Sequence, residues 1–314
     1  MLRNVIDYSA YLAVRLLICL VQAVDVETCA TVATWLAGIC SDRLRLRRAV
    51  IDENLRHAFP EKSQAERDVI CRKMWEHLLV MIVEMAQAPR KIHDTNWRDY
   101  CTLAEPELMM RTLFDERPTI LLSGHYGNFE LSSYVLGMLG FHVYGIARPL
   151  DNVYLDRFVN RFRGASGQHI LAKNGSATVI DALMARGGNL GFLVDQHAGP
   201  KGCYVQFFGR PASTHKAIAV FALGYQAPVL FGFTRRLGKP LHCMVGCTAV
   251  ADPRKLSDAE ATAPALTQWF TTRLEEVVRV APEQYWWVHR RWKDMREPRR
   301  TARQAAPQSD ARAA

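Results

Sequence analysis

Apolar and polar residues follow two different periods along most of this chain. Short apolar runs rich in branched residues predict buried strands, whereas apolar residues at intervals of three or four predict helices. The predicted strands cover residues 120–122, 143–146, 170–171, 190–194 and 229–233. Helical patterns lie between them, at residues 131–139, 153–162, 177–185 and 216–223. This alternation predicts an α/β fold in which helices flank a mixed, partly parallel sheet.

Two apolar stretches precede this core, at residues 8–24 and 29–40, and Arg15 interrupts the first. A membrane span needs about 20 apolar residues, and an arginine near its centre costs roughly 2.5–3.5 kcal/mol on insertion scales. We therefore expect residues 1–42 to form a helical, membrane-associated segment that lies on the bilayer more readily than it crosses. Four arginines between residues 43 and 48 suit anionic headgroups. A buried helical hairpin is the alternative.

Residues 43–297 are expected to form one globular domain, followed by a disordered basic tail at residues 298–314. Ser63 and Glu66 have the spacing of a capping box and predict a long helix that ends at Pro89. Residues 205–214 predict a strand, a turn and a helix that begins at Ser213 or Thr214. Aromatic and basic residues mix at 282–293, where we expect an internal packing seam with a basic outer edge.

Composition narrows the class of partner. A net charge of +9 and a pI near 9.2 favour acidic partners, such as nucleic acid, anionic lipid or an acidic carrier protein. The hydrophobic content of 49% excludes a disordered chain. No Cys-x-x-Cys pair occurs among the eight cysteines, which fits reduced thiols.

A candidate for proton transfer lies at the first predicted strand-to-helix turn. Gly124 and Gly127 permit a sharp turn around His125, and Glu130 follows in the first helical turn. A carboxylate bonded to one ring nitrogen leaves the other free to take a proton from a hydroxyl. No Gly-x-Ser-x-Gly elbow supports a serine nucleophile. In the alternative interpretation, His125 caps the helix and Glu130 pairs with a surface cation.

Two further polar positions follow predicted strands. In an α/β sheet, ligands bind beyond the carboxyl ends of the strands, so Arg148 and Asp195 are expected near His125. Arg148 could bind phosphate or stabilise an oxyanion, or be a solvated loop residue. Asp195 is expected to orient a cation such as Arg148. Asp195 and His197 alone do not make a metal site, and we expect no metal.

Several of these motifs, in this order, resemble the late acyltransferases of lipid A biosynthesis, the lauroyl and myristoyl transferases. That family also includes phosphatidylinositol mannoside acyltransferases. Its His-x-x-x-x-Asp/Glu motif matches His125 and Glu130. Further matches lie at residues 54–61, 148–152, 195–196, 207–212 and 282–291. The chain departs from the family at its amino terminus, where members carry a clearer anchoring helix.

The resemblance implies an O-acyltransferase with no cofactor and no covalent intermediate. It would move a fatty acyl chain from an acyl carrier protein or acyl-CoA donor to a lipid A precursor, a membrane glycolipid, at the cytoplasmic face of the cell inner membrane. His125 and Glu130 would be catalytic. Residues that bind substrate or the oxyanion would be Arg148, Asn128, Asp195 and Gln196.

Two alternatives stay open at this stage. One is an acyltransferase for another glycolipid or a phospholipid, and the other is a non-catalytic membrane lipid-binding protein. No nucleic-acid-binding motif accompanies the basic charge, so nucleic acid is not an expected partner.

Overall fold

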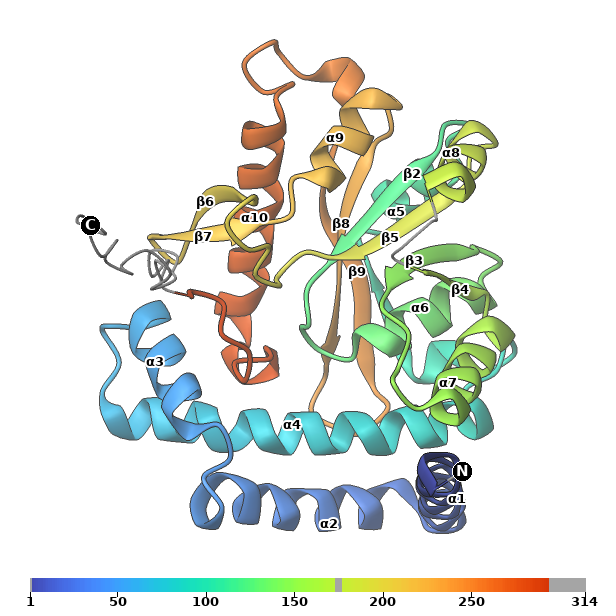
Figure 1. Cartoon of the computed structure of the whole chain (residues 1–314), viewed down its shortest axis with the longest axis vertical. Helices are drawn as coiled ribbons and strands as arrows, with labels where there is room; N and C mark the ends of the chain where they lie inside the picture. Colours follow the sequence, from blue (N-terminus) through green and yellow to red (C-terminus); the bar gives the residue numbers. More distant parts are fainter. Residues whose placement is uncertain (1, 173–176, 294–314) are drawn as a thin grey trace, which may run out of the picture.

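A seven-stranded sheet forms the centre of the molecule in the computed structural model, which describes residues 2–172 and 177–293 (Figure 1). Its spatial order is β1-β9-β8-β2-β5-β3-β4. The strands are β1 (Cys101–Ala104), β2 (Thr119–Ser123), β3 (Val143–Ala147), β4 (Gln168–Ala172), β5 (Asn189–Leu193), β8 (Val229–Arg236) and β9 (Cys243–Ala251). The predicted basic tail at residues 298–314 lies outside the described residues.

All neighbouring strands of this sheet pair in parallel except β8 and β9, which are antiparallel. The predicted mixed, partly parallel sheet is therefore confirmed, and each of the five predicted strands is present. The sequence pattern missed β1 and β9. These two strands extend the sheet beyond β8, where β9 returns from β8 and β1 forms the outer edge.

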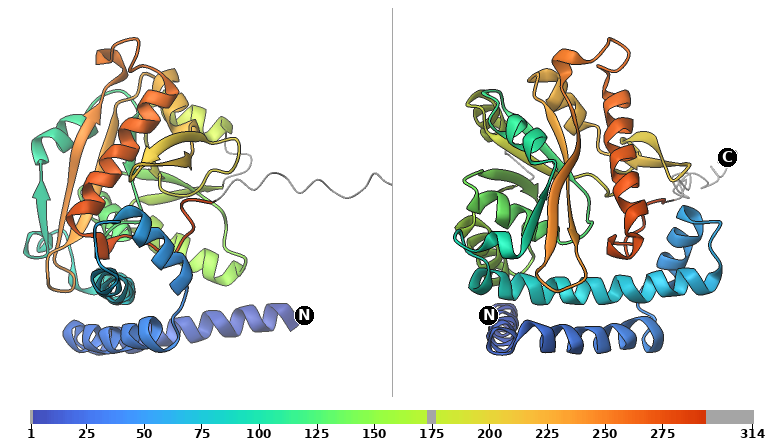
Figure 2. Two further views of the ribbon diagram at one scale, coloured as in Figure 1. Left: turned by 90° about the vertical axis from the view of Figure 1, so that its left-hand side faces the viewer. Right: turned by 180° about the vertical axis from the view of Figure 1, so that it is seen from behind.

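The described part of the chain forms ten α-helices. They are α1 (Leu2–Ala23), α2 (Val26–Gly38), α3 (Arg48–Ala58), α4 (Gln64–Lys91), α5 (Pro106–Leu113), α6 (Phe129–Met138), α7 (Val153–Ala165), α8 (Ala177–Ala185), α9 (Ala217–Gly224) and α10 (Ala263–Val280). Ile180 of α8, Ile218 of α9 and Phe270 of α10 share a core with Leu122 of β2. Met109 of α5 packs with Leu121 on the opposite face. The sheet is thus covered on both sides (Figure 2).

The amino-terminal helices α1 and α2 form a layer beneath α4 (Figures 1 and 2). Gln87 of α4 ties the layer down, because its Nε2 donates to the carbonyl oxygens of Val21 and Val24. Tyr8 of α1 packs edge-on against Tyr154 of α7, with ring centroids 5.1 Å apart. By length and composition, α1 is apolar enough from Arg3 to Ala23 to cross a membrane.

Helix α4 begins as predicted but ends later. Ser63 accepts from the backbone N–H of Glu66 while Glu66 accepts from that of Ser63, which completes the capping box. The helix then runs through Pro89 to Lys91, so the predicted end at Pro89 is wrong. Pro89 lacks a backbone N–H and so removes one helical hydrogen bond. The helical hydrogen bonds resume after it, and the N–H of Ile92 donates to the carbonyl of Ala88 at 2.8 Å.

Residues 203–214 form an antiparallel hairpin of β6 (Cys203–Phe207) and β7 (Arg210–Thr214). The predicted helix start at Ser213 or Thr214 is therefore wrong, and α9 begins at Ala217. Phe208 and Gly209 both have positive φ angles, +50° and +70°. Two such residues in succession suit a two-residue hairpin turn, which sends the chain back as a strand.

The aromatic segment near residue 287 is an internal seam, as predicted. Trp287 is buried between Phe59 and Phe208, with ring centroids 5.8 Å and 5.9 Å away. The basic residues are not all on its outer edge. Arg291 is 1% exposed and donates to the carbonyl of Ser213 at 2.7 Å, so it joins the carboxyl-terminal segment to β7.

Candidate active site

The turn between β2 and α6 carries His125 and is held in place by a segment far along the chain. Gly127 has a φ of +58°, and a Cβ added there would lie 1.4 Å from the carbonyl oxygen of Thr234. Only glycine fits this approach. The N–H of Gly127 donates to the carbonyl of Gln284, and the N–H of Trp286 donates to that of His125. The backbone of the turn is therefore clamped by residues 284–286.

Asp195, which follows β5, binds His125 through both of its oxygens. The His125 Nδ1 lies 2.7 Å from Asp195 Oδ1, and the His125 backbone N–H donates to Oδ2 at 3.0 Å. Burial alone raises the pKa of Asp195, but the charge and hydrogen bonds of His125 outweigh it and hold that pKa well below its usual range. The ionised carboxylate fixes Nδ1 as the protonated nitrogen and leaves Nε2 to accept a proton.

Glu130 does not contact the His125 ring, contrary to the prediction, because it is ion-paired with Arg163 of α7. Asp195 is the carboxylate on the ring instead. The reason is geometric: β2 and β5 are parallel neighbours, and residue 195 comes just beyond the pair Ser123–Leu193. The backbone contact to Oδ2 turns the His125 side chain toward β5. Asp195 therefore orients the His125 ring. The prediction that Asp195 orients Arg148 is wrong.

His125 borders a cavity of about 890 Å³. This volume lies in the upper part of the range for small-molecule sites, about 300–1,000 Å³. Its lining is mostly apolar and comes from both strands and helices, including Leu121, Leu136, Val143, Phe192 and Phe221. The polar side chains of the lining, among them Glu130, Arg148, Arg163 and Gln196, are a minority. Such a cavity suits a hydrocarbon chain whose reacting end meets the imidazole.

Comparison with known proteins identifies the class of enzyme. The family model for bacterial lipid A biosynthesis acyltransferase matches residues 1–294. The chain belongs to this acyltransferase family. It is 27% identical over 259 residues to a lipid A biosynthesis lauroyltransferase of Escherichia coli K12, covering 80% of each chain. A palmitoleoyltransferase of the same organism is 23% identical over 256 residues, again covering 80% of each chain.

A third curated relative of this acyltransferase is the E. coli K12 lipid A biosynthesis myristoyltransferase, 25% identical over 248 residues, which are 77% of this chain and 73% of the relative. Among solved structures, a 1-acyl-sn-glycerophosphate acyltransferase, PlsC, from Thermotoga maritima is similar over 82% of this chain and 96% of that one. Its identity is 12% and its TM-score is 0.36.

Asn128 was predicted to bind substrate or the oxyanion, but in the acyltransferase its polar atoms face inward. Its Oδ1 accepts from the N–H of Leu131 and so caps α6, while its Nδ2 donates to Glu84 at 2.9 Å. The side chain is 1% exposed. It holds the start of α6, and thereby the His125 turn, without direct access to substrate.

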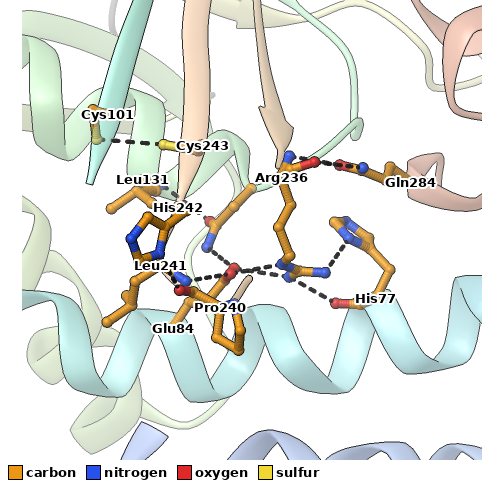
Figure 3. A network of polar contacts seen from close by, with 11 residues as sticks. His77, Glu84, Cys101, Leu131, Arg236, Pro240, Leu241, His242, Cys243 and Gln284 are labelled. Carbon is orange, nitrogen blue, oxygen red and sulfur yellow. Dashed lines mark hydrogen bonds and ion pairs between the residues drawn. The ribbon is translucent and has the colours of Figure 1, made fainter. Parts of the chain in front are cut away.

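Glu84 is the centre of a buried polar network that joins three parts of the acyltransferase (Figure 3). Besides Asn128, it accepts from Arg236 of β8 and from the backbone N–H of Leu241. Arg236 also donates to His77 Nδ1 at 2.8 Å. Burial, and then the Arg236 charge, lower the pKa of His77 to about 3, so this imidazole is neutral.

Gln284 links this network to the clamped turn. Its Oε1 accepts from the backbone N–H of Arg236 at 2.8 Å, and its Nε2 donates to the Arg236 carbonyl at 3.1 Å. The Gln284 carbonyl in turn accepts from Gly127. A continuous set of hydrogen bonds therefore connects α4, the β8–β9 hairpin and the His125 turn.

Arg148 and Gln196 both border the cavity of the acyltransferase, together with His125. The Arg148 side chain is largely solvent-exposed and pairs with the equally exposed Asp151 at 2.9 Å. An exposed pair of this kind is weak and easily exchanged for another anion. These two residues, unlike Asn128 and Asp195, keep the access that a substrate-binding role requires.

Sequence reasoning missed Glu84, Arg163, Arg236 and His289. His289 Nε2 lies 3.0 Å from the carbonyl oxygen of Asp195, and its Nδ1 lies 2.8 Å from that of Trp286. It therefore supports both residues that hold His125. One signal was visible for Glu84, since a lone acid within the apolar stripe of a helix must find a buried partner. The partners themselves are more than 40 residues away.

Proposed function

We propose that this acyltransferase moves a fatty acyl chain from an acyl carrier protein or coenzyme A thioester to a hydroxyl of a lipid A precursor. The observation that carries the proposal is the His125–Asp195 pair at an apolar cavity of about 890 Å³. The names of the relatives support the acceptor class, since all three are lipid A biosynthesis acyltransferases.

The reaction needs only the residues of the pair for its proton transfers. His125 Nε2 takes the proton of the acceptor hydroxyl as the oxygen attacks the thioester carbonyl. The tetrahedral intermediate then expels the thiolate, which recovers the proton from the imidazolium. Asp195 stabilises the imidazolium without accepting its proton. Bonds and protons balance in this sequence without a cofactor or a covalent enzyme intermediate.

The remaining predicted residues have supporting roles in this proposal. Arg148 and Gln196 would bind the acceptor phosphate or the oxyanion, because both border the cavity. The positive charge of the chain suits an acidic carrier protein as well as a phosphorylated glycolipid. The exposed apolar side chains of α1 suit the cytoplasmic surface of the inner membrane.

The test is a transfer assay with a His125→Ala variant. The purified enzyme is incubated with an acyl-carrier or coenzyme A thioester and an under-acylated lipid A precursor, and the product is weighed by mass spectrometry. We expect the wild type to add one acyl chain and the variant to be at least about 100-fold slower. His93→Ala, at an exposed position two residues after α4, is the control and should match the wild type.

Two results would contradict the proposal in different ways. If neither donor adds a chain to the acceptor with the wild type, the substrate assignment is wrong. If the His125→Ala variant transfers at the wild-type rate, the general-base assignment is wrong while the substrate assignment stands.

A further inference from the structure

The central sheet divides between β3 and β5. These strands pair at three positions, and the last pair is Gly145 with Gly191. Beyond it each strand continues with its other neighbour only: Ala147 pairs with Ala172 of β4, and Leu193 pairs with Ser123 of β2. The sheet therefore forks at its carboxyl-terminal edge, on the side where His125 and Asp195 lie.

The residues beyond the fork are more exposed than their position predicts. Both β3 and β5 are interior strands with helices over both faces, so their residues should be buried. Instead, residues 146–147 of β3 and residues 192–193 of β5 are all partly exposed, as are the two glycines of the last pair. Consecutive strand residues point to opposite faces of a sheet. The space is therefore open on both faces of the sheet.

The same alternation is seen in the walls of the cavity. Leu121 and Leu122 are neighbours in β2, and both line it, as do Gly191 and Phe192 in β5. One part, here called the α6 lobe, lies between the sheet and helices α5 and α6, and is lined by Met109, Leu113, Leu121, Leu136 and Val143. The other part, the α9 lobe, is lined by Leu122, Ile146, Ile180, Phe192, Ile218 and Phe221.

We propose that the two lobes hold two hydrocarbon chains at once, the donor acyl chain in the α6 lobe and an acyl chain of the acceptor lipid in the α9 lobe. This inference rests on the proposed function, because it assigns places to both substrates of that reaction. The thioester carbonyl and the hydroxyl to be acylated then belong to two chains that approach His125 from opposite faces of the sheet, through the fork.

Polar groups at the rims decide which chain takes which lobe. Arg148 follows β3, His215 precedes α9, and both border the cavity together with Gln196. The Arg148 guanidinium and the Gln196 amide there suit the phosphates of the acceptor headgroup. In the α6 lobe the charged side chains are Glu130 and Arg163, which neutralise each other. Its remaining wall ends on Met109 and Leu113, which are buried and suit the methyl end of a simple acyl chain.

Two substitutions fill one lobe each. A Cβ at Gly145 would lie 3.5 Å from Ile170 Cδ1 and 3.9 Å from the Gly191 carbonyl oxygen, which are ordinary contacts, so Gly145→Leu extends into the α6 lobe. Gly191 is unsuitable, because a Cβ there would lie 2.8 Å from Val143 Cγ1. Ala217→Trp adds bulk to the α9 lobe from an exposed position at the start of α9.

The experiment measures kcat/KM for a series of donor chain lengths and, separately, for acceptors whose hydroxyacyl chains differ in length. We expect Gly145→Leu to favour shorter donors, by about fourfold for each methylene group excluded, with an unchanged acceptor profile. Ala217→Trp should favour acceptors with shorter hydroxyacyl chains and leave the donor profile unchanged. Gly164→Leu, where an added Cβ meets nothing within 4 Å, and the exposed Ala182→Trp are the matched controls. Parallel shifts of both profiles in either variant would overturn the proposal.

Equilibrium dialysis separates this inference from the proposed function. Radiolabelled dodecanoate is the probe, with equal detergent in both chambers. Two molecules should bind per wild-type chain and one per single variant. If the wild type transfers nothing but binds two, the function assignment fails and the two-lobe inference stands. If the wild type binds one, or if neither variant loses a molecule, the two-lobe inference is wrong.

Discussion

The ring of His125 depends on a carboxylate that is distant in sequence. Glu130, five residues away, lies in the first turn of α6 and is ion-paired with Arg163, which neutralises its charge. Asp195 reaches both the ring and the backbone of His125 from the end of the adjacent strand. The two contacts together allow one imidazole orientation and one tautomer, which a general base requires.

Exchange of the two carboxylates for amides distinguishes their roles. Asp195→Asn preserves size but removes the charge that stabilises the imidazolium, so we expect kcat to fall by roughly 10²–10⁴ with little change in KM. Glu130→Gln can still accept a hydrogen bond from Arg163, and kcat should fall less than about tenfold. Steady-state kinetics of the two variants, with circular dichroism to check folding, provide the test. The opposite order of effects would indicate that the imidazole turns to Glu130 when substrate binds.

The elements around the site are fixed by polar contacts that cross the core. Helix α4 carries His77 and Glu84 on the buried side that faces the β8–β9 hairpin, and Arg236 reaches both. Glu84 also orders Asn128, which caps α6. A buried charge is costly unless it is paired, so this network fixes how α4, β8 and α6 pack relative to one another.

His77 should make the fold sensitive to mild acid. Its pKa is about 3 in the folded chain and 6.5 for an ordinary histidine. Only the unfolded chain takes up the proton between these values, so stability falls as pH drops below 6.5. At pH 5 the loss is about 2 kcal/mol. Chemical unfolding at pH 7.5 and pH 5 measures this difference. The free energy of unfolding of His77→Gln should fall by about 2 kcal/mol less than that of the wild type.

The control for this measurement is His93→Gln, because His93 is exposed just after the same helix. Between pH 7.5 and pH 5, this control variant should lose as much stability as the wild type loses. If His77→Gln loses as much stability as the wild type between the two pH values, the acid sensitivity comes from other groups and the network is not its source.

In the described part of the molecule, the outer surface of the α1–α2 layer is apolar. The outward side chains of the α1–α2 layer include Leu16, 63% exposed, and Trp35, 66% exposed. Exposed apolar residues gathered over two neighbouring helices mark an interaction surface. In the proposed function a lipid substrate leaves a bilayer to enter the cavity, and we expect this exposed apolar layer to be the surface that contacts the bilayer.

Leu16→Glu and Trp35→Glu should each weaken binding to vesicles of phosphatidylglycerol and phosphatidylethanolamine. Burial of one large apolar side chain stabilises by about 1.5–3 kcal/mol, which corresponds to a roughly 10- to 100-fold loss of affinity. Cosedimentation with vesicles measures this. Phe114→Glu changes a residue that is 74% exposed and should bind as the wild type does. Phe114 follows α5 in the chain, and Figure 1 shows α5 away from the α1–α2 layer's end of the molecule. Equal losses in all three variants would exclude the layer as the membrane surface.

Local patterns in the sequence were sufficient for the parts of this protein that depend on neighbours along the chain. Residues 119–130 read as strand, turn and helix because the apolar run, the glycines and the helical spacing all lie within one short segment. The capping box at Ser63 needs only residues three apart. The ordered motifs pointed to the family for a related reason, since each is short and contiguous.

Only the tertiary structure determined which side chains contact one another. The carboxylate on His125 is 70 residues away, and β5 lies beside β2 only in the finished sheet. Asn128 lies in the matched motif, yet its side chain serves Glu84 and the α6 cap. The hairpin at residues 203–214 and the strand β9 likewise depend on neighbours that spacing does not reveal. Spacing measures distance along the chain, whereas hydrogen bonds, ion pairs and cavities are set by distance in space.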